Sequence, residues 1–91
     1  MIQKIKAPIS VITAFNHKNI LSVPVIINWD GKTYKVKKVG FHHKYKIGNT
    51  LYHSYSVTCS SKNHKSTFFK IILNTASLSW ELEEISDGEA D

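Results

Sequence analysis

The sequence of 91 residues has little cysteine, no long apolar run and few helix signals, and each shortage excludes a class of protein. A single cysteine, Cys59, excludes an internal disulfide framework and a cysteine-rich zinc site. No apolar run approaches the roughly 18 residues of a transmembrane helix, and residues 1–10 lack the apolar segment of a secretory signal. Because 42% of the residues are hydrophobic, the chain can bury a core. We therefore expect one small cytoplasmic domain.

Arginine is also absent, and acidic residues are scarce over most of the chain. All 12 basic residues are lysines, and residues 1–80 contain one acid, Asp30, whereas the remaining acids lie in residues 81–91. The positive charge of residues 1–80 favours a polyanionic partner such as nucleic acid. Because the chain lacks arginine, whose guanidinium group can form two hydrogen bonds to one base, we expect any nucleic-acid binding to have low sequence specificity. The acidic end could compete with nucleic acid, bind a basic patch of a partner or maintain solubility.

β-Branched and aromatic residues fill the apolar positions, and no long segment keeps a helical period. The clearest local feature is Asp30-Gly31, a pair typical of tight hairpins, between strands expected near residues 24–29 and 32–41. The apolar alternation slips at Lys37-Lys38, which predicts a β-bulge there, and Phe41 then returns to the apolar face.

Beyond this hairpin, a polar basic loop is expected over residues 42–49, followed by three more strands near 50–59, 67–73 and 78–85. In the last of these, Leu78 is expected to point inward with the core residues. The predicted core consists of Trp29, Tyr34, Val36, Phe69, Ile71, Trp80 and Leu82.

Three segments divide the chain. Residues 1–23 form an N-terminal segment with one strand, ISVITAF, followed by a loop over residues 15–22. Residues 24–85 form the β core, and residues 86–91 form an acidic tail that we expect to fray. Short strands joined by short turns predict an all-β, five- or six-stranded antiparallel meander curled into a small barrel or half-barrel.

Three stretches carry a resemblance: PISV at residues 8–11, VPVIINWDGKTYKV at residues 23–36, and FFKIILNTASLSWELEEI at residues 68–85. Through them the chain resembles a family of small all-β bacterial domains of unknown function. It departs from that pattern after Phe41, where HHKYK replaces a longer insertion containing tryptophan. The resemblance implies a compact β fold and supplies neither an activity nor catalytic residues.

Metal binding and catalysis both lack a supporting pattern. The histidines and Cys59 match no spacing of a zinc motif. Cys59 with His53 or His64 could pair a nucleophile with a base, but Asp30, the one acid before residue 81, is already explained by the hairpin turn. We therefore expect a protein that is not an enzyme and holds no metal or cofactor.

The sequence pattern that most clearly indicates a function combines lysines with aromatic rings. Rings on a β-sheet flanked by lysines can stack bases while the lysines contact phosphates. The expected binding residues are Lys37, His42, His43, Lys44, Tyr45, Lys46, Tyr52, Phe68 and Lys70. The sequence thus predicts binding of single-stranded nucleic acid or RNA, and leaves open a protein-interaction or accessory module that pairs with a partner or a second copy through a strand edge.

Overall fold

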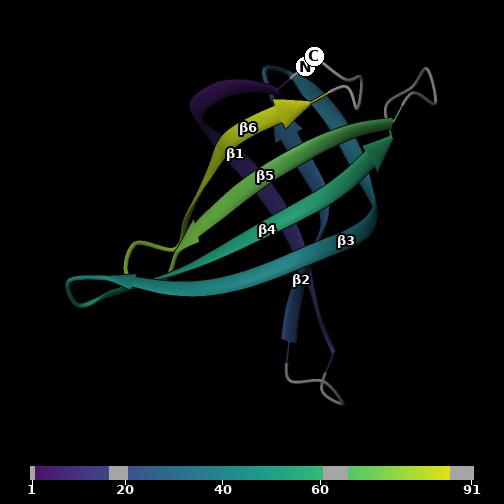
Figure 1. Cartoon of the computed structure of the whole chain (residues 1–91). Helices are drawn as coiled ribbons and strands as arrows, with labels where there is room; N and C mark the ends of the chain where they lie inside the picture. Colours follow the sequence, from purple (N-terminus) through teal and green to yellow (C-terminus); the bar gives the residue numbers. More distant parts are fainter. Residues whose placement is uncertain (1, 17–20, 61–65, 87–91) are drawn as a thin grey trace.

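The computed structural model describes residues 2–16, 21–60 and 66–86. Their six strands are β1 (Ile2–Asn16), β2 (Leu21–Trp29), β3 (Lys32–Ile47), β4 (Thr50–Ser60), β5 (Ser66–Asn74) and β6 (Ser79–Ser86). Each strand pairs in antiparallel fashion with the next, and β1 also pairs with β6, so that the meander closes into a barrel (Figure 1). The predicted all-β meander is confirmed in its closed, six-stranded form. No helix that could span a membrane occurs among the described residues.

The core fills the barrel with side chains from alternate strand positions, as the two-residue period of a strand requires. Its buried apolar members are Ile27, Tyr34, Tyr55, Val57, Cys59, Phe69, Ile71 and Leu82. The Phe69 ring meets Tyr34 edge-on, with ring centroids 4.8 Å apart, and Trp29 at 6.3 Å. Four of the predicted core residues are therefore buried, whereas Trp29, Val36 and Trp80 are partly buried and pack against the core.

Strand β3 contains two β-bulges, of which the sequence predicts one. The register with β4 shifts between Val36 and Lys38, which confirms the bulge expected at Lys37-Lys38. It shifts a second time between Val39 and Phe41, around Gly40. The second bulge turns Phe41 outward, where 60% of the residue is exposed. The prediction that Phe41 lies on the apolar face is therefore wrong.

The basic loop expected over residues 42–49 is also wrong. Residues 42–47 continue β3 and pair with β4 up to Ile47, and only Gly48 and Asn49 form the turn. Gly48 has φ +60°, a conformation that glycine adopts without strain. The resulting β3–β4 hairpin extends beyond the barrel as an arm (Figure 1).

Other boundaries also differ from expectation, and β1 begins at Ile2, seven residues before the expected strand ISVITAF. Leu78 belongs to the turn before β6, has φ +56° and is 76% exposed, so it does not point inward. The loop expected over residues 15–22 is wrong at both ends, because residues 15–16 belong to β1 and residues 21–22 to β2. Strand β6 includes Ser86, which the sequence assigned to the tail, and residues 17–20 and 87–91 lie outside the described part.

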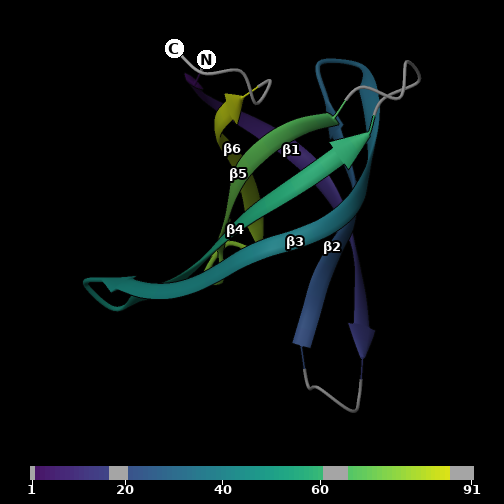
Figure 2. The same cartoon turned by 45° about the vertical axis from the view of Figure 1, so that its right-hand side comes forward.

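The barrel has a seam between β2 and β3. These strands pair only where residues 26–29 face residues 32–35. Beyond Lys35, β3 pairs only with β4 among the described residues, and β2 diverges from it toward β1 (Figure 2). Within the described part of the chain, one edge of β3 is therefore unpaired along the arm.

Candidate nucleic-acid interface

Strand β3 divides the predicted binding residues between two faces. Residues directly opposite each other on paired strands point to the same side of a sheet. His42 pairs with Tyr55, which is buried, so His42 lies on the core side of β3. The two-residue period places Lys44 and Lys46 on that side as well, where they are exposed because the arm extends past the barrel. These three residues are not part of the outer surface.

The outer face of the same arm carries four aromatic rings in sequence, which we call the ring ladder: Phe41, His43 and Tyr45 on β3, and Tyr52 on β4. Successive rings are nearly parallel, with centroids 6.2, 6.0 and 5.3 Å apart and planes inclined by 19°, 20° and 12°. The structure thus joins three predicted residues with Phe41, which the sequence pattern assigned to the core. Gly40 inside a strand was the signal that could have revealed the second bulge.

A shallow groove lies beside the ring ladder on the outer face, and we call it the outer groove. Its volume is about 520 Å³, and its lining residues are Phe41, His43, Tyr45, Ser54, Ser56, Lys70, Glu83 and Glu84. The rings come from β3, the small serines from β4, and the charged side chains from β5 and β6. Lys70 and Glu83 form an ion pair with Nζ and Oε2 3.6 Å apart. The groove therefore combines rings, hydroxyls and both charge signs.

Tyr45 stays protonated in this setting. Partial burial raises the pKa of its phenol above the ordinary value, and the negative charge of Glu83 raises it further, against an opposing effect of Lys70. A protonated phenol can donate a hydrogen bond as well as accept one. Tyr45 can therefore offer a ligand its hydroxyl both as a donor and as an acceptor.

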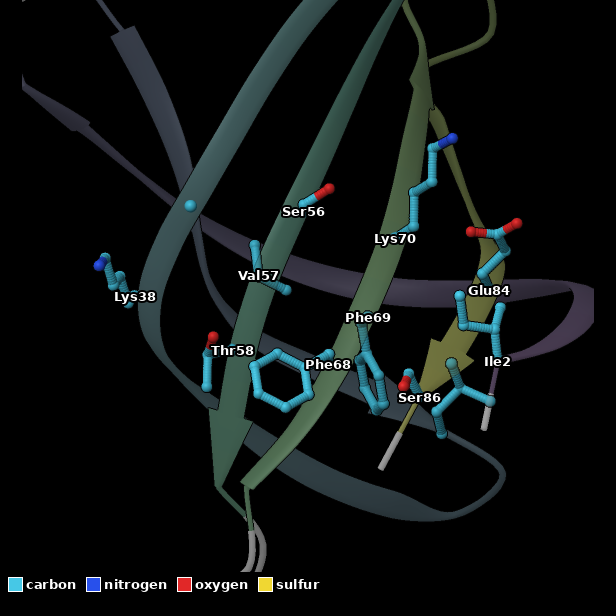
Figure 3. A pocket seen from close by; sticks show the side chains of 12 residues that line it. Ile2, Lys38, Ser56, Val57, Thr58, Phe68, Phe69, Lys70, Glu84 and Ser86 are labelled. Atoms are coloured by element: carbon cyan, nitrogen blue, oxygen red, sulfur yellow. The ribbon is translucent and has the colours of Figure 1, made fainter. Parts of the chain in front are cut away.

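A second hollow of about 380 Å³ adjoins the outer groove and shares Ser56, Lys70 and Glu84 with it. Figure 3 shows Phe68 of β5 beside Thr58 of β4, its partner in register. Lys38 lines the hollow, and the adjacent Lys37 is exposed at the first bulge. Lysines therefore stand on both the β3 and β5 sides of this surface.

On the core side, His42 and His53 form a coupled pair. Nε2 of His42 lies 2.7 Å from Nδ1 of His53, and the His42 ring stacks on Tyr55 with centroids 4.5 Å apart. Burial lowers the pKa of both imidazoles, and the positive charge of Lys44 lowers both further. Both rings are therefore neutral at pH 7, and one donates its N–H to the other.

The described residues offer no support for a metal centre or a reactive thiol. They contain no group of three or more histidine, cysteine, aspartate or glutamate residues that could hold a metal ion. Cys59 is fully buried, and burial raises the pKa of its thiol to about 12. Because the thiolate is the nucleophilic form, this cysteine is chemically inert in the folded protein.

The comparisons with known proteins give no relative: no family model, no curated protein and no solved structure matches the chain.

Proposed function

We propose that this protein is a non-enzymatic cytoplasmic module that binds single-stranded nucleic acid or RNA, with low sequence specificity, through the outer groove and the ring ladder. The observation that carries the proposal is the alignment of four rings on one outer face beside lysines. Stacking on an aromatic ring contributes about 1–3 kcal/mol per base and tolerates any base.

The lysines would contact the phosphates. Lys37 and Lys38 are exposed on β3, and Lys70 lines both hollows. Each neutralised phosphate releases counterions, so that affinity falls as salt rises. The lysine ammonium group acts as a point charge and lacks the paired donors of an arginine guanidinium group. Lysine therefore suits contacts to the phosphate backbone and discriminates little between bases.

The proposed site thus keeps six of the residues expected from sequence and adds two. It consists of Lys37, Lys38, Phe41, His43, Tyr45, Tyr52, Phe68 and Lys70. His42, Lys44 and Lys46 are left out because they lie on the opposite face of β3.

Fluorescence anisotropy with labelled single-stranded DNA and RNA, at low and near-physiological salt, tests the proposal. We expect Lys38→Ala to weaken binding more than Lys46→Ala, because both substitutions remove one exposed charge from β3 but on opposite faces. Tyr45→Ala should lose about 1–3 kcal/mol of binding free energy at either salt concentration. Absence of binding at low salt would refute the proposal, and equal effects of the two lysine substitutions would place the site elsewhere.

A second candidate function rests on the edge of β3 that no other described strand pairs with beyond Lys35. An exposed edge can accept an extended strand from a partner protein or from a second copy of the chain. The lysines and the two bulges of β3 oppose such pairing, which is why we rank this function second. Size-exclusion chromatography with light scattering checks self-association. A dimer that persists at high salt would favour this function, whereas a monomer would exclude pairing with a second copy and leave only pairing with a different protein.

A further inference from the structure

The outer groove contains two carboxylates, Glu83 and Glu84, opposite the ring ladder. A surface that only attracted phosphates would gain nothing from them, because like charges repel. Their position is therefore better matched to a part of a nucleotide that donates hydrogen bonds, namely the edge of a base.

Glu83 is directed by an irregularity of β6. Lys70 pairs with Glu84, and Ile71 pairs with Leu82, so Glu83 is the extra residue of a β-bulge. Bulges re-aim side chains near binding sites. The carboxylate also forms the ion pair with Lys70, and both side chains line the outer groove together with Tyr45.

The pair Lys70 and Glu83 offers three donor or acceptor positions in one place: an ammonium donor and two carboxylate oxygens. Guanine is the base whose pairing edge has two adjacent N–H donors beside a carbonyl oxygen, so it can satisfy all three. Uracil has one N–H between two carbonyl oxygens and would place an oxygen against the carboxylate.

We propose that the outer groove prefers guanine to uracil, with Tyr45 stacking on the base and Glu83 and Lys70 contacting its edge. This inference rests on the proposed function and adds a base preference to it. Phosphate contacts along the strand remain indifferent to sequence, so selectivity is confined to the nucleotide in the groove.

The test uses the full chain and fluorescein-labelled nonamer RNAs made of uridines with a single central guanosine, or with uridine throughout. Anisotropy titrations at one fixed salt concentration give the ratio of the two dissociation constants. We expect the guanosine RNA to bind about tenfold more tightly, within the discrimination that a two-bond contact to a base gives.

Glu83→Gln should bring this ratio close to one. Glu81→Gln is the matched control, because it removes the same charge from β6 but Glu81 is exposed and does not line the groove. Both substitutions remove one negative charge and should strengthen binding of the all-uridine RNA alike, whereas only Glu83→Gln also loses the contact to guanine, so the ratio is the decisive quantity.

The outcomes separate this inference from the proposed function. Salt-sensitive binding with equal affinity for both RNAs would overturn the guanine preference and leave the proposed function intact. A guanine preference that survives in the Glu83→Gln variant would overturn the assignment to this carboxylate. No binding of either RNA at low salt would overturn both proposals together.

Discussion

Two adjacent phenylalanines of β5 provide a direct test of the barrel register. Phe69 is 2% exposed and makes edge contacts with Tyr34 and Trp29, whereas 42% of Phe68 is exposed on the outer face. Replacing each with alanine removes the same atoms from neighbouring positions on one strand. We expect Phe69→Ala to be strongly destabilising and Phe68→Ala to be nearly neutral.

The magnitudes follow from burial. Truncating a buried phenylalanine costs about 3–5 kcal/mol, and the two ring contacts of Phe69 place it in the upper part of that range. A surface substitution such as Phe68→Ala should cost less than about 1 kcal/mol. At about 0.05–0.15 kcal/mol per residue, the whole chain has an unfolding free energy of about 5–14 kcal/mol, so Phe69→Ala removes a large part of it.

Urea unfolding, followed by tryptophan fluorescence and circular dichroism, measures both variants. If Phe69→Ala does not fold, Phe69→Leu retains much of the apolar volume and should still be less stable than Phe68→Leu. Equal losses at the two positions would refute the reasoning, because a shift of one residue in the register of β5 exchanges its faces.

The other predictions concern the thiol, the histidine pair and the first turn. Cys59 should resist a thiol reagent in the native protein and react only on unfolding, since it is buried and its pKa is raised to about 12. Burial lowers the folded-state pKa of His42 and His53, so the unfolded chain binds more protons than the folded chain below pH 6.5. The melting temperature should therefore fall as the solution is acidified through that value. A rise would contradict the lowered pKa of the two histidines. Gly31→Ala should lower the free energy of unfolding, measured in urea, by about 1–2 kcal/mol. The cost comes from backbone strain at φ +73° alone, because the added Cβ would meet no atom within 4 Å.

The parts of the fold that were predictable are those that short-range chemistry determines. The turn at Asp30-Gly31 has positive φ at both residues, 53° and 73°, which this dipeptide tolerates and a tight hairpin needs. The strand at residues 66–74 alternates clearly enough to place Phe69 and Ile71 inside. Neither feature depends on a distant part of the chain.

The arm was not predictable in this way. Residues 42–47 contain two histidines and two lysines beside Tyr45 and Ile47, and this mixture does not alternate between apolar and polar residues as a half-buried strand does. They are extended because residues 50–55 of β4 pair with them one by one. That pairing decides which face each residue occupies, and it separates His42 from His43, which a loop would have left free to converge on one ligand.

The two bulges of β3 explain why the ring ladder was not predicted from the sequence, since that prediction included only the first bulge. Each bulge adds one residue and exchanges the faces of everything that follows it. With the first bulge alone, Val39 and Phe41 would both face the core; the second, around Gly40, restores the original phase and turns Phe41 outward. His43 and Tyr45 then follow Phe41 by alternation. The outer aromatic surface therefore depends on a glycine that contributes no side chain to it, and recognising such a surface requires locating the bulges before assigning the faces.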